Sequence, residues 1–401
     1  MRSIMTKNER YGVVGILLGG IALASIFWLL DVTAFNTVAY QNTPTNKEPV
    51  ATSTTGDDID GNDSAVSAPV WPASLDKEEY DERMLALAGY EPSFETIIAT
   101  SSTGATTTTK KRINDLVYAS SSNVTVEGEL WPTAAPYPHG GAILPFHRII
   151  TYYGNLYSTR MGILGEFPKE EVLRRLKEEI SHWEAADPDT PVMPAIEYIV
   201  SVAQADAGAD GMYRNVMPDS EIDKAYQIAK EANGIFILDL QVGLSTIQKE
   251  LPQFRSYLEE SDVHLAIDPE FSMKTGAAPG TRIGSYNATD INFVIDYLAD
   301  IVQEKQLPPK VLIVHRFTDR MVQNASAIKP RPEVQVVMVM DGWGPRGLKR
   351  GTYSRVVDSD PVQFAGLKIF YKNDLKPPST GLLSPQQSLD LNPTPIYVQF
   401  Q

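Results

Sequence analysis

Cysteine is absent from the 401 residues, which excludes disulfide bonds, thiolate metal ligands, a cysteine nucleophile and a lipid anchor on cysteine. Histidine is scarce, with five residues, and neither H-x-H nor H-E-x-x-H occurs. Positive charge is also in short supply, because 35 Lys and Arg face 50 Asp and Glu, for a formal net charge of −15. This balance argues against nucleic acid and anionic membrane surfaces as partners. Carboxylates must therefore carry most of any acid–base chemistry, and no cofactor is expected.

One long uncharged run is present near the N-terminus. Residues 11–30 contain no charged side chain and are long enough to cross a hydrocarbon core of about 30 Å as a helix. Basic residues precede the run and an aspartate follows it, so the positive-inside rule places residues 1–10 in the cytoplasm. We therefore predict a single-pass anchor in the cytoplasmic membrane, with the rest of the chain extracytoplasmic. A cleaved signal peptide, with a weak cleavage site at 37–39, is the competing interpretation.

Polar segments separate this run from the rest of the chain. Residues 31–74 are rich in Thr, Ser, Asn, Asp and Pro, which is typical of a flexible tether. Residues 75–91 have an amphipathic helical pattern, whose apolar stripe consists of Tyr80, Met84, Leu87 and Ala88. We expect this short helix to dock on the domain that follows. Residues 92–130 are again rich in Ser and Thr and are predicted to be a second linker.

Strand and helix patterns alternate through residues 131–401. The apolar strand candidates are 148–155, 192–204, 234–242, 263–271, 310–317, 334–341, 364–372 and 395–400. Helical patterns lie between them at 168–186, 219–233, 245–260, 289–306, 319–329 and 347–358. This alternation predicts an α/β fold, a (β/α)8 TIM-like barrel. An open doubly wound sheet is the alternative, but no G-x-G-x-x-G motif follows the first strand.

The connecting segments are unequal in length. Those that follow a helix are short and most carry Pro or Gly, whereas several that follow a strand are long, namely 156–167, 205–218, 272–288 and 373–383. In (β/α)8 barrels, sites are built from the loops at the carboxyl ends of the strands. The sequence therefore predicts a functional site at that end.

Polar side chains gather at the predicted carboxyl ends of the strands. Asp268 and Glu270 end the fourth strand and have the same orientation, because side chains alternate along a strand. A carboxylate pair beside a core is costly unless hydrogen bonds, cations or a function account for it. One explanation is a buried salt-bridge network that closes the barrel, such as Lys368 with Asp268 and Asp341.

A carbohydrate site is the other explanation. Glycoside hydrolases place two carboxylates across the scissile bond. Glu270 is the candidate general acid, because partial desolvation keeps a carboxyl group protonated, and Asp268 or Asp341 would be the second carboxylate. Glu197 also points inward on the second strand. Substrate would be bound by the other polar and aromatic residues near the strand ends: Tyr152, Tyr153, Asn155, Asp239, Gln241, His315, Trp343, Lys368 and Gln399.

Two local patterns resemble chitinase-type (family 18) glycoside hydrolases, whose fourth strand reads D-x-x-D-x-D-x-E and whose sixth reads M-x-Y-D. Here the fourth strand ends in Asp268-Pro269-Glu270 and residues 338–341 read M-V-M-D. The resemblance implies that Glu270 is the acid, Asp268 the residue that steers an acetamido group, and Asp341 a transition-state contact. The sequence departs from the family pattern at Val263, Ala266 and Met340.

A wider resemblance covers about residues 130–401. Stretches such as I-T-Y-Y-G-N-L-Y-S-T-R-M-G, H-L-A-I-D-P-E-F-S-M and V-V-M-V-M-D-G-W-G are similar to a family of uncharacterised bacterial envelope proteins, some of them described only as lipoproteins. This resemblance implies the barrel fold and a location at the cell surface, and it implies no particular activity.

Three hypotheses follow from the sequence. The first is a membrane-anchored glycoside hydrolase that acts on envelope or environmental glycans, without a metal ion. The second is a non-catalytic barrel that binds a glycan, another small-molecule ligand or a partner protein at the cell surface. The third is a metal-dependent hydrolase, whose oxygen and imidazole ligands would come from Asp239, Asp268, Glu270, His315 and Asp341.

Overall fold

The computed structural model describes residues 74–90, 94–100, 106–112 and 116–401. The predicted membrane anchor at 11–30 lies outside these residues, as does the predicted tether at 31–74 apart from its last residue. None of the helices formed by the described residues is long and apolar enough to cross a membrane. The anchor and the tether therefore stay predictions from sequence.

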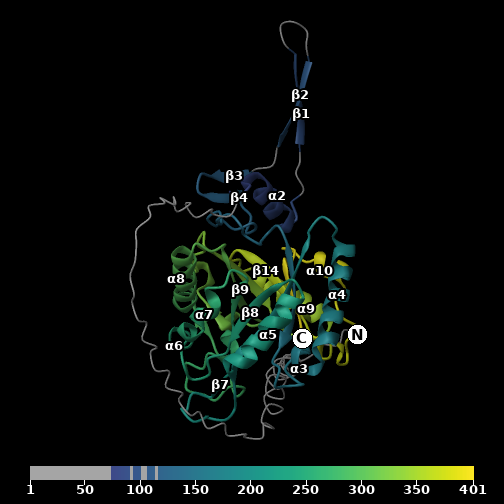
Figure 1. Ribbon diagram of the computed structural model, residues 1–401. Coiled ribbons are helices and arrows are strands. Elements are labelled where there is room, and N and C mark those ends of the chain that lie inside the picture. Colours follow the sequence, from purple (N-terminus) through teal and green to yellow (C-terminus); the bar gives the residue numbers. More distant parts are fainter. Residues whose placement is uncertain (1–73, 91–93, 101–105, 113–115) are drawn as a thin grey trace, which may run out of the picture.

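Eight parallel strands close into a barrel, with the longer helices on its outside (Figure 1). Each strand pairs with the next one around the ring, and the last pairs with the first to close it. This confirms the predicted (β/α)8 barrel and its predicted strands. The strands are β5 (Arg148–Gly154), β6 (Val192–Ala203), β8 (Ile235–Leu240), β9 (Val263–Ile267), β11 (Lys310–Arg316), β13 (Val334–Met340), β14 (Phe364–Ile369) and β15 (Tyr397–Phe400).

The outer helices largely follow the predicted apolar periodicity. Those predicted at 168–186, 219–233, 289–306 and 347–358 correspond to α4 (Lys169–Ala186), α5 (Asp219–Glu231), α8 (Ala288–Lys305) and α9 (Arg346–Tyr353). A π-helical turn (Ser354–Asp358) extends α9. Two short helices, α3 (Ile163–Glu166) and α10 (Pro385–Leu389), lie in connecting segments.

Two predicted helices are not continuous in the structure. The pattern at 245–260 forms α6 (Ile247–Glu250), a 3-10 turn (Leu251–Phe254) and α7 (Arg255–Leu258). Pro252 explains the break, because proline removes a backbone donor and disfavours a helix interior. The helix predicted at 319–329 is wrong, since this segment forms two 3-10 turns (Asp319–Met321 and Ala325–Ala327) around the short strand β12 (Val322–Gln323). Asn324 there has a left-handed φ of 57°, which an α-helix does not tolerate.

Strand alternation produces two apolar layers. Residues such as Ile149, Ile237, Ala266, Ile313 and Val337 form a cluster inside the barrel. Their neighbours along the strands belong to a separate cluster that packs beneath the outer helices, including Ile150, Leu238, Leu265, Val314 and Met338. The interior is therefore a filled core, and only the residues nearest the strand ends are free to serve other purposes.

A short helix, α2 (Lys77–Leu87), covers the amino end of the barrel (Figure 1). Asp76 caps it by accepting a hydrogen bond from the Glu79 amide. Tyr80 and Met84 are buried and belong to the same cluster as the barrel interior. The structure thus has a helix within the predicted segment 75–91, and its buried side chains pack on the barrel.

The Ser/Thr-rich segment 92–130 contains strands where its composition predicts a linker. Strands β1 (Phe94–Thr100) and β2 (Thr106–Arg112) form an antiparallel pair that projects away from the barrel (Figure 1). Strands β3 (Leu116–Ala119) and β4 (Ser122–Val126) form a second antiparallel pair next to α2. The physical reason is that threonine is β-branched, so a threonine-rich run favours strands as well as solvation.

Candidate functional site

A set of polar side chains fills the carboxyl end of the barrel. Their side chains point into the barrel, because each lies two positions along its strand from a residue of the interior apolar layer or continues that spacing. Pairing of neighbouring strands places Tyr153 beside Glu197 and Lys368 beside Gln399. We call the set the polar ring; its members are Tyr153, Glu197, Asp239, Asp268, His315, Asp341, Lys368 and Gln399. Apart from Asp341, all of them are at most 4% exposed. The structure thus brings together most of the residues predicted to form the site.

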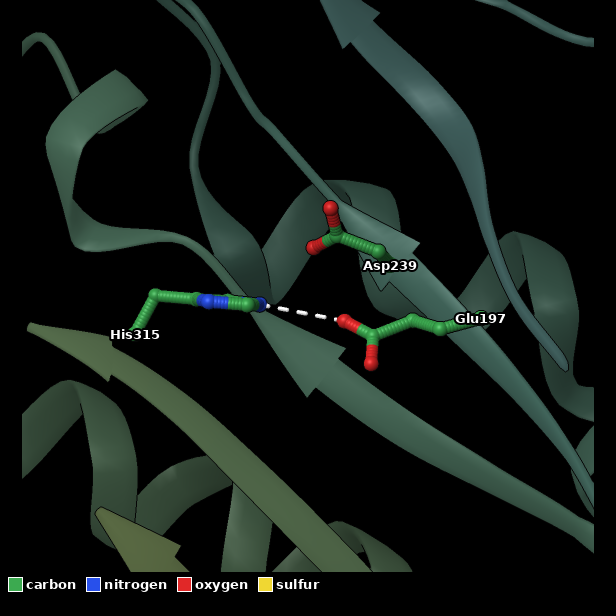
Figure 2. A group of neighbouring side chains, drawn as sticks. All are labelled: Glu197, Asp239 and His315. Carbon is green, nitrogen blue, oxygen red and sulfur yellow. Dashed lines mark hydrogen bonds and ion pairs between the residues drawn. The ribbon is translucent and has the colours of Figure 1, made fainter. Parts of the chain in front are cut away.

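Glu197, Asp239 and His315 form the centre of the polar ring (Figure 2). They come from β6, β8 and β11, and their side chains point toward one another. His315 Nε2 lies 3.1 Å from Glu197 Oε1, and one ligand-type atom from each of the three residues lies within 4.8 Å of the others. All three side chains are inaccessible to solvent. The three could hold a metal ion.

Tyrosine hydroxyls hold the outer oxygens of these two carboxylates. Tyr153 donates a hydrogen bond of 3.0 Å to Asp239 Oδ2, and Tyr397 donates one to Glu197 Oε2. Gln241 and Gln399 in turn donate to the two tyrosine hydroxyls, at 3.4 and 3.3 Å. Each carboxylate is therefore fixed in orientation by a layer of neutral donors.

Two cations flank Asp341 at the outer side of the polar ring. Lys368 Nζ lies 3.2 Å from Asp341 Oδ1, and His315 Nδ1 lies 3.1 Å from Asp341 Oδ2. Lys368 also sits over the ring of Tyr153, 3.9 Å from its centre. Below it, the buried Lys349 donates to the Lys368 carbonyl oxygen and pairs with Asp374 at 3.1 Å. The network of Lys368 and Asp341 foreseen from sequence is present.

Glu270 lies at the rim, on a 3-10 turn (Pro269–Phe271) that directly follows β9. Asp268 caps this turn, because its Oδ1 accepts a 2.9 Å hydrogen bond from the Glu270 amide. The segment after the turn folds back, and the Gly284 amide donates to the Glu270 carbonyl oxygen at 2.6 Å. No side chain fits at position 284, because a Cβ there would lie 2.5 Å from the Ser272 carbonyl oxygen. Glu270 is half-buried, like Asp341 and unlike the other members of the polar ring.

The environment moves the pKa values of these groups in opposite directions. Burial raises the pKa of Asp239 and of Glu270 well above the usual range, and burial raises that of Asp268 to about 6. Burial also acts to raise the pKa of Asp341, but Lys368 and His315 outweigh it and lower that pKa. For His315, burial acts to lower the pKa, and the carboxylates of Asp341 and Glu197 outweigh it and raise that pKa well above its usual value.

Several predicted site residues lie apart from the polar ring. Tyr152 points outward from β5, where its hydroxyl lies 3.2 Å from that of Tyr371. Asn155 is buried and donates to the Ile199 carbonyl oxygen, which fixes the turn after β5. Gln241 reaches the polar ring only through Tyr153. Trp343 is half-exposed on the loop after Asp341, with Lys376 over its ring.

Other residues of the site had not been singled out in the sequence. Tyr397 donates a hydrogen bond to Glu197. It could have been predicted to face the same way as Gln399, because it lies two positions before it on the same strand. Lys349 lies on the helix α9 and Asp374 on a 3-10 turn (Asn373–Leu375), where no strand periodicity points to them. These two were found only through the fold.

Two surface hollows lie elsewhere on the barrel. One is beside α2, among residues that include Met84 and Trp131, and the other is near the amino ends of the strands, beside Ile235 and His264. Neither contains a member of the polar ring.

Comparisons with known proteins give no family. No family model matches the chain, and no curated protein sequence matches it. Among solved structures it is similar to a GH5-4 broad specificity endoglucanase from an uncultured bovine rumen ciliate, at 12% identity and a TM-score of 0.29, over 51% of this chain and 72% of that one. It is also similar to a family GH13_31 enzyme, at 11% identity and a TM-score of 0.20, over 56% of this chain and 47% of that one. Both likenesses are too distant to argue from, so the barrel assignment rests on the strand order itself.

Proposed function

We propose that the protein is a glycoside hydrolase that works at the carboxyl end of its barrel, with Glu270 as the general acid. One observation carries the proposal. The Glu270 carboxyl group stands half-buried at the rim, and within the described part of the chain no hydrogen bond or ion pair engages it. A structural carboxylate in such a place normally has a cation or a donor. A general acid needs its carboxyl group free to meet the substrate.

The charges around Glu270 support the same role. Burial raises its pKa well above the usual value, and the nearby Asp268 and Asp341 carboxylates raise it further. Asp341 is kept ionised by contacts with Lys368 and His315. One carboxyl group that keeps its proton beside one that stays charged is the arrangement found in glycosidases. In this proposal Asp341 stabilises the positive charge that develops on the sugar ring.

The surroundings of the rim suit a sugar. Trp343 follows Asp341 by two residues and is partly exposed, so in this proposal the face of its ring that Lys376 does not cover is the platform for an apolar sugar face. The segment 272–284 is tied back to Glu270 through the Gly284 amide, which supports the exclusion of water from the reacting group. The similarity of Asp268-x-Glu270 and Met338–Asp341 to family 18 enzymes makes β-linked amino sugars the first substrates to test.

The test compares Glu270→Gln with Glu82→Gln, an exposed glutamate on α2 at the other end of the barrel. Release of reducing ends would be measured on a panel of polysaccharides that includes chitin, cellulose and peptidoglycan. We expect Glu270→Gln to lower turnover by about 10²–10⁴-fold with little change in melting temperature, because glutamine keeps the shape but donates no such proton. Glu82→Gln should behave as the parent does.

Two results would overturn the proposal. A Glu270→Gln variant that folds normally and still cleaves at the parent rate would remove Glu270 from the chemistry. A parent protein that binds a glycan in affinity electrophoresis and cleaves nothing on the panel would instead support a non-catalytic binding barrel.

The uncharged run at 11–30 supports a location at the outer face of the cytoplasmic membrane. The similarity to bacterial envelope proteins supports the same location, where glycans of the envelope are within reach. Protease added to intact spheroplasts should then digest the barrel. Protection until the cells are lysed would place the barrel in the cytoplasm.

A further inference from the structure

The three residues at the centre of the polar ring have no role in the glycoside hydrolysis proposed above. We propose that Glu197, Asp239 and His315 form a binding site for one divalent transition-metal ion, of the Zn²⁺ or Mn²⁺ class. Their ligand-type atoms lie within 4.8 Å of one another, on three different strands of the barrel (Figure 2). The proposal is independent of Glu270 and of any glycan.

An unused oxygen points to a missing partner at this place. Asp239 is fully buried, yet its Oδ1 atom has no hydrogen-bond partner, while its Oδ2 atom accepts from Tyr153. A buried carboxylate oxygen without a partner costs free energy and calls for an explanation. The Asp239 carboxylate points toward Glu197 and the His315 ring, so an ion held by those two residues would lie beside this carboxylate (Figure 2).

Residues outside the trio lie behind each of the three side chains, and two of the three accept a hydrogen bond from them. Tyr397 donates to the outer oxygen of Glu197, and Tyr153 donates to the outer oxygen of Asp239. Behind His315, Asp341 Oδ2 lies 3.1 Å from Nδ1, on the opposite side of the imidazole from Glu197. A carboxylate behind a metal-binding histidine, which fixes its tautomer and orientation, is a recurrent feature of metal sites. Glu197 and Asp239 therefore have hydrogen-bonded support, whereas His315 has the Asp341 carboxylate within ion-pair distance and no aligned hydrogen bond at Nδ1.

The distances and the donor types suit a transition-metal ion. Metal–ligand bonds of about 2.0–2.2 Å place neighbouring ligand atoms about 3 Å apart, close to the 3.1 Å between His315 Nε2 and Glu197 Oε1. Asp239 would need to close the remaining gap by a small side-chain movement. One imidazole and two carboxylates suit Zn²⁺ or Mn²⁺, whereas Mg²⁺ and Ca²⁺ prefer oxygen ligands alone.

The local charge also favours a cation. Glu197, Asp239, Asp268 and Asp341 face His315 and Lys368 at the carboxyl end of the barrel. A divalent ion that replaces the ring proton of His315 adds one positive charge to this buried group. Because ligands must lose their protons to bind a metal ion, binding releases protons and affinity should rise with pH.

The experiment uses the purified chain, stripped with EDTA and dialysed against metal-free buffer. We expect about one equivalent of Zn²⁺ or Mn²⁺ to bind in calorimetry and to raise the melting temperature. Co²⁺ should give visible absorption bands typical of a bound ion with nitrogen and oxygen ligands. The variants Asp239→Asn and His315→Gln should lose the Co²⁺ bands and bind at least about 10-fold more weakly, as expected when a direct ligand is removed.

The matched control is Asp268→Asn, a buried aspartate on the neighbouring strand β9 that is not one of the three ligands. It should keep the Co²⁺ spectrum and the stoichiometry. The proposal fails if the parent binds none of these ions, or if Asp268→Asn loses the ion as completely as the Asp239 variant does. A Glu270→Gln variant should bind the ion normally, so loss of glycan turnover and loss of metal are separate results.

Discussion

The two ends of the barrel are built from the same eight strands and yet solve burial in opposite ways. At the amino end, α2 inserts Tyr80 and Met84 against the interior apolar layer. At the carboxyl end, the same alternation carries the polar ring inward, with four carboxylates and two cations among its members. The difference shows that an inward position in a barrel does not decide polarity. The polarity of an inward position depends on how far along the barrel axis the residue lies and on which segments cover that end.

Ionisable groups occur at the amino end as well, and two of them, Lys310 and His264, have backbone groups as their partners. The ammonium of Lys310 donates to the carbonyl oxygens of Glu260 and Val263, and His264 Nδ1 accepts from the Val311 amide. Burial lowers the pKa of Lys310 to about 8 and lowers that of His264 well below its usual value. These groups tend toward neutrality, whereas the charges of the polar ring stabilise one another. The two ends should therefore respond differently to mutation and to pH.

The largest effect on stability is expected from Lys368→Met at the carboxyl end. This change leaves Asp341 buried with His315 as its remaining cation, and breaking a buried pair in this way lowers the free energy of unfolding by about 3–5 kcal/mol. The control is Lys372→Met, because Lys372 pairs with Glu166 near the end of the same strand but is 70% exposed. The control should cost less than about 1 kcal/mol in urea denaturation. Equal losses in the two variants would contradict the account of the polar ring.

At the amino end we expect a smaller effect, a dependence of the free energy of unfolding on pH that comes from Lys310. The pKa of Lys310 is about 8 in the folded protein, against 10.5 when unfolded. Between these values the unfolded chain binds more protons, so the free energy of unfolding rises as pH increases through this window. The rise that Lys310 contributes approaches about 3 kcal/mol.

The contribution of Lys310 is isolated by comparing the parent with Lys310→Met from pH 7 to pH 10. The difference between their unfolding free energies should shift in favour of the parent as pH rises. A difference that stays constant over this range would show that Lys310 is charged in the folded protein.

The smallest effect comes from a matched pair of tyrosines, one at each end. Tyr153→Phe removes the donor to Asp239 Oδ2 and should cost about 1–3 kcal/mol. The Tyr80 hydroxyl is near Gln363 but has no well-aligned hydrogen bond, so Tyr80→Phe should change stability by less than about 0.5 kcal/mol. Thermal unfolding monitored by circular dichroism would measure both. A costlier Tyr80→Phe would mean that the two ends do not differ in how they use buried hydroxyl groups.

Much of the architecture could be predicted from local patterns. Apolar runs such as 310–317 and 334–341 gave their strands, because a buried parallel strand is a short apolar run whatever its neighbours are. The alternation of side chains along a strand, in which every second residue points to the same face, is also consistent with Asp268, His315 and Lys368 on the inner face. Local reading failed at 319–329, where Asn324 breaks the helix, and at 92–130, where threonine favours strands.

The site itself depends on relations that this alternation cannot supply. The alternation separates Tyr153, which points inward, from Tyr152, which points outward, only after the register of β5 is known. It does not fix how far each strand is shifted along the barrel axis. That shift decides that Glu197, Asp239 and His315 meet at one level while His264 lies near the opposite end.

The sequence alone therefore determined the barrel, the end at which loops and charges accumulate, and the alternation of side chains along each strand, because these follow from the period of the strand and the length of each segment. Closure of the barrel decided the rest. It brought three strands far apart in sequence to a common level, placed Tyr397 behind Glu197 and Lys349 beneath Lys368, and left Glu270 open at the rim. Contacts of this kind depend on the stagger of the strands and on helix packing, which no local pattern encodes.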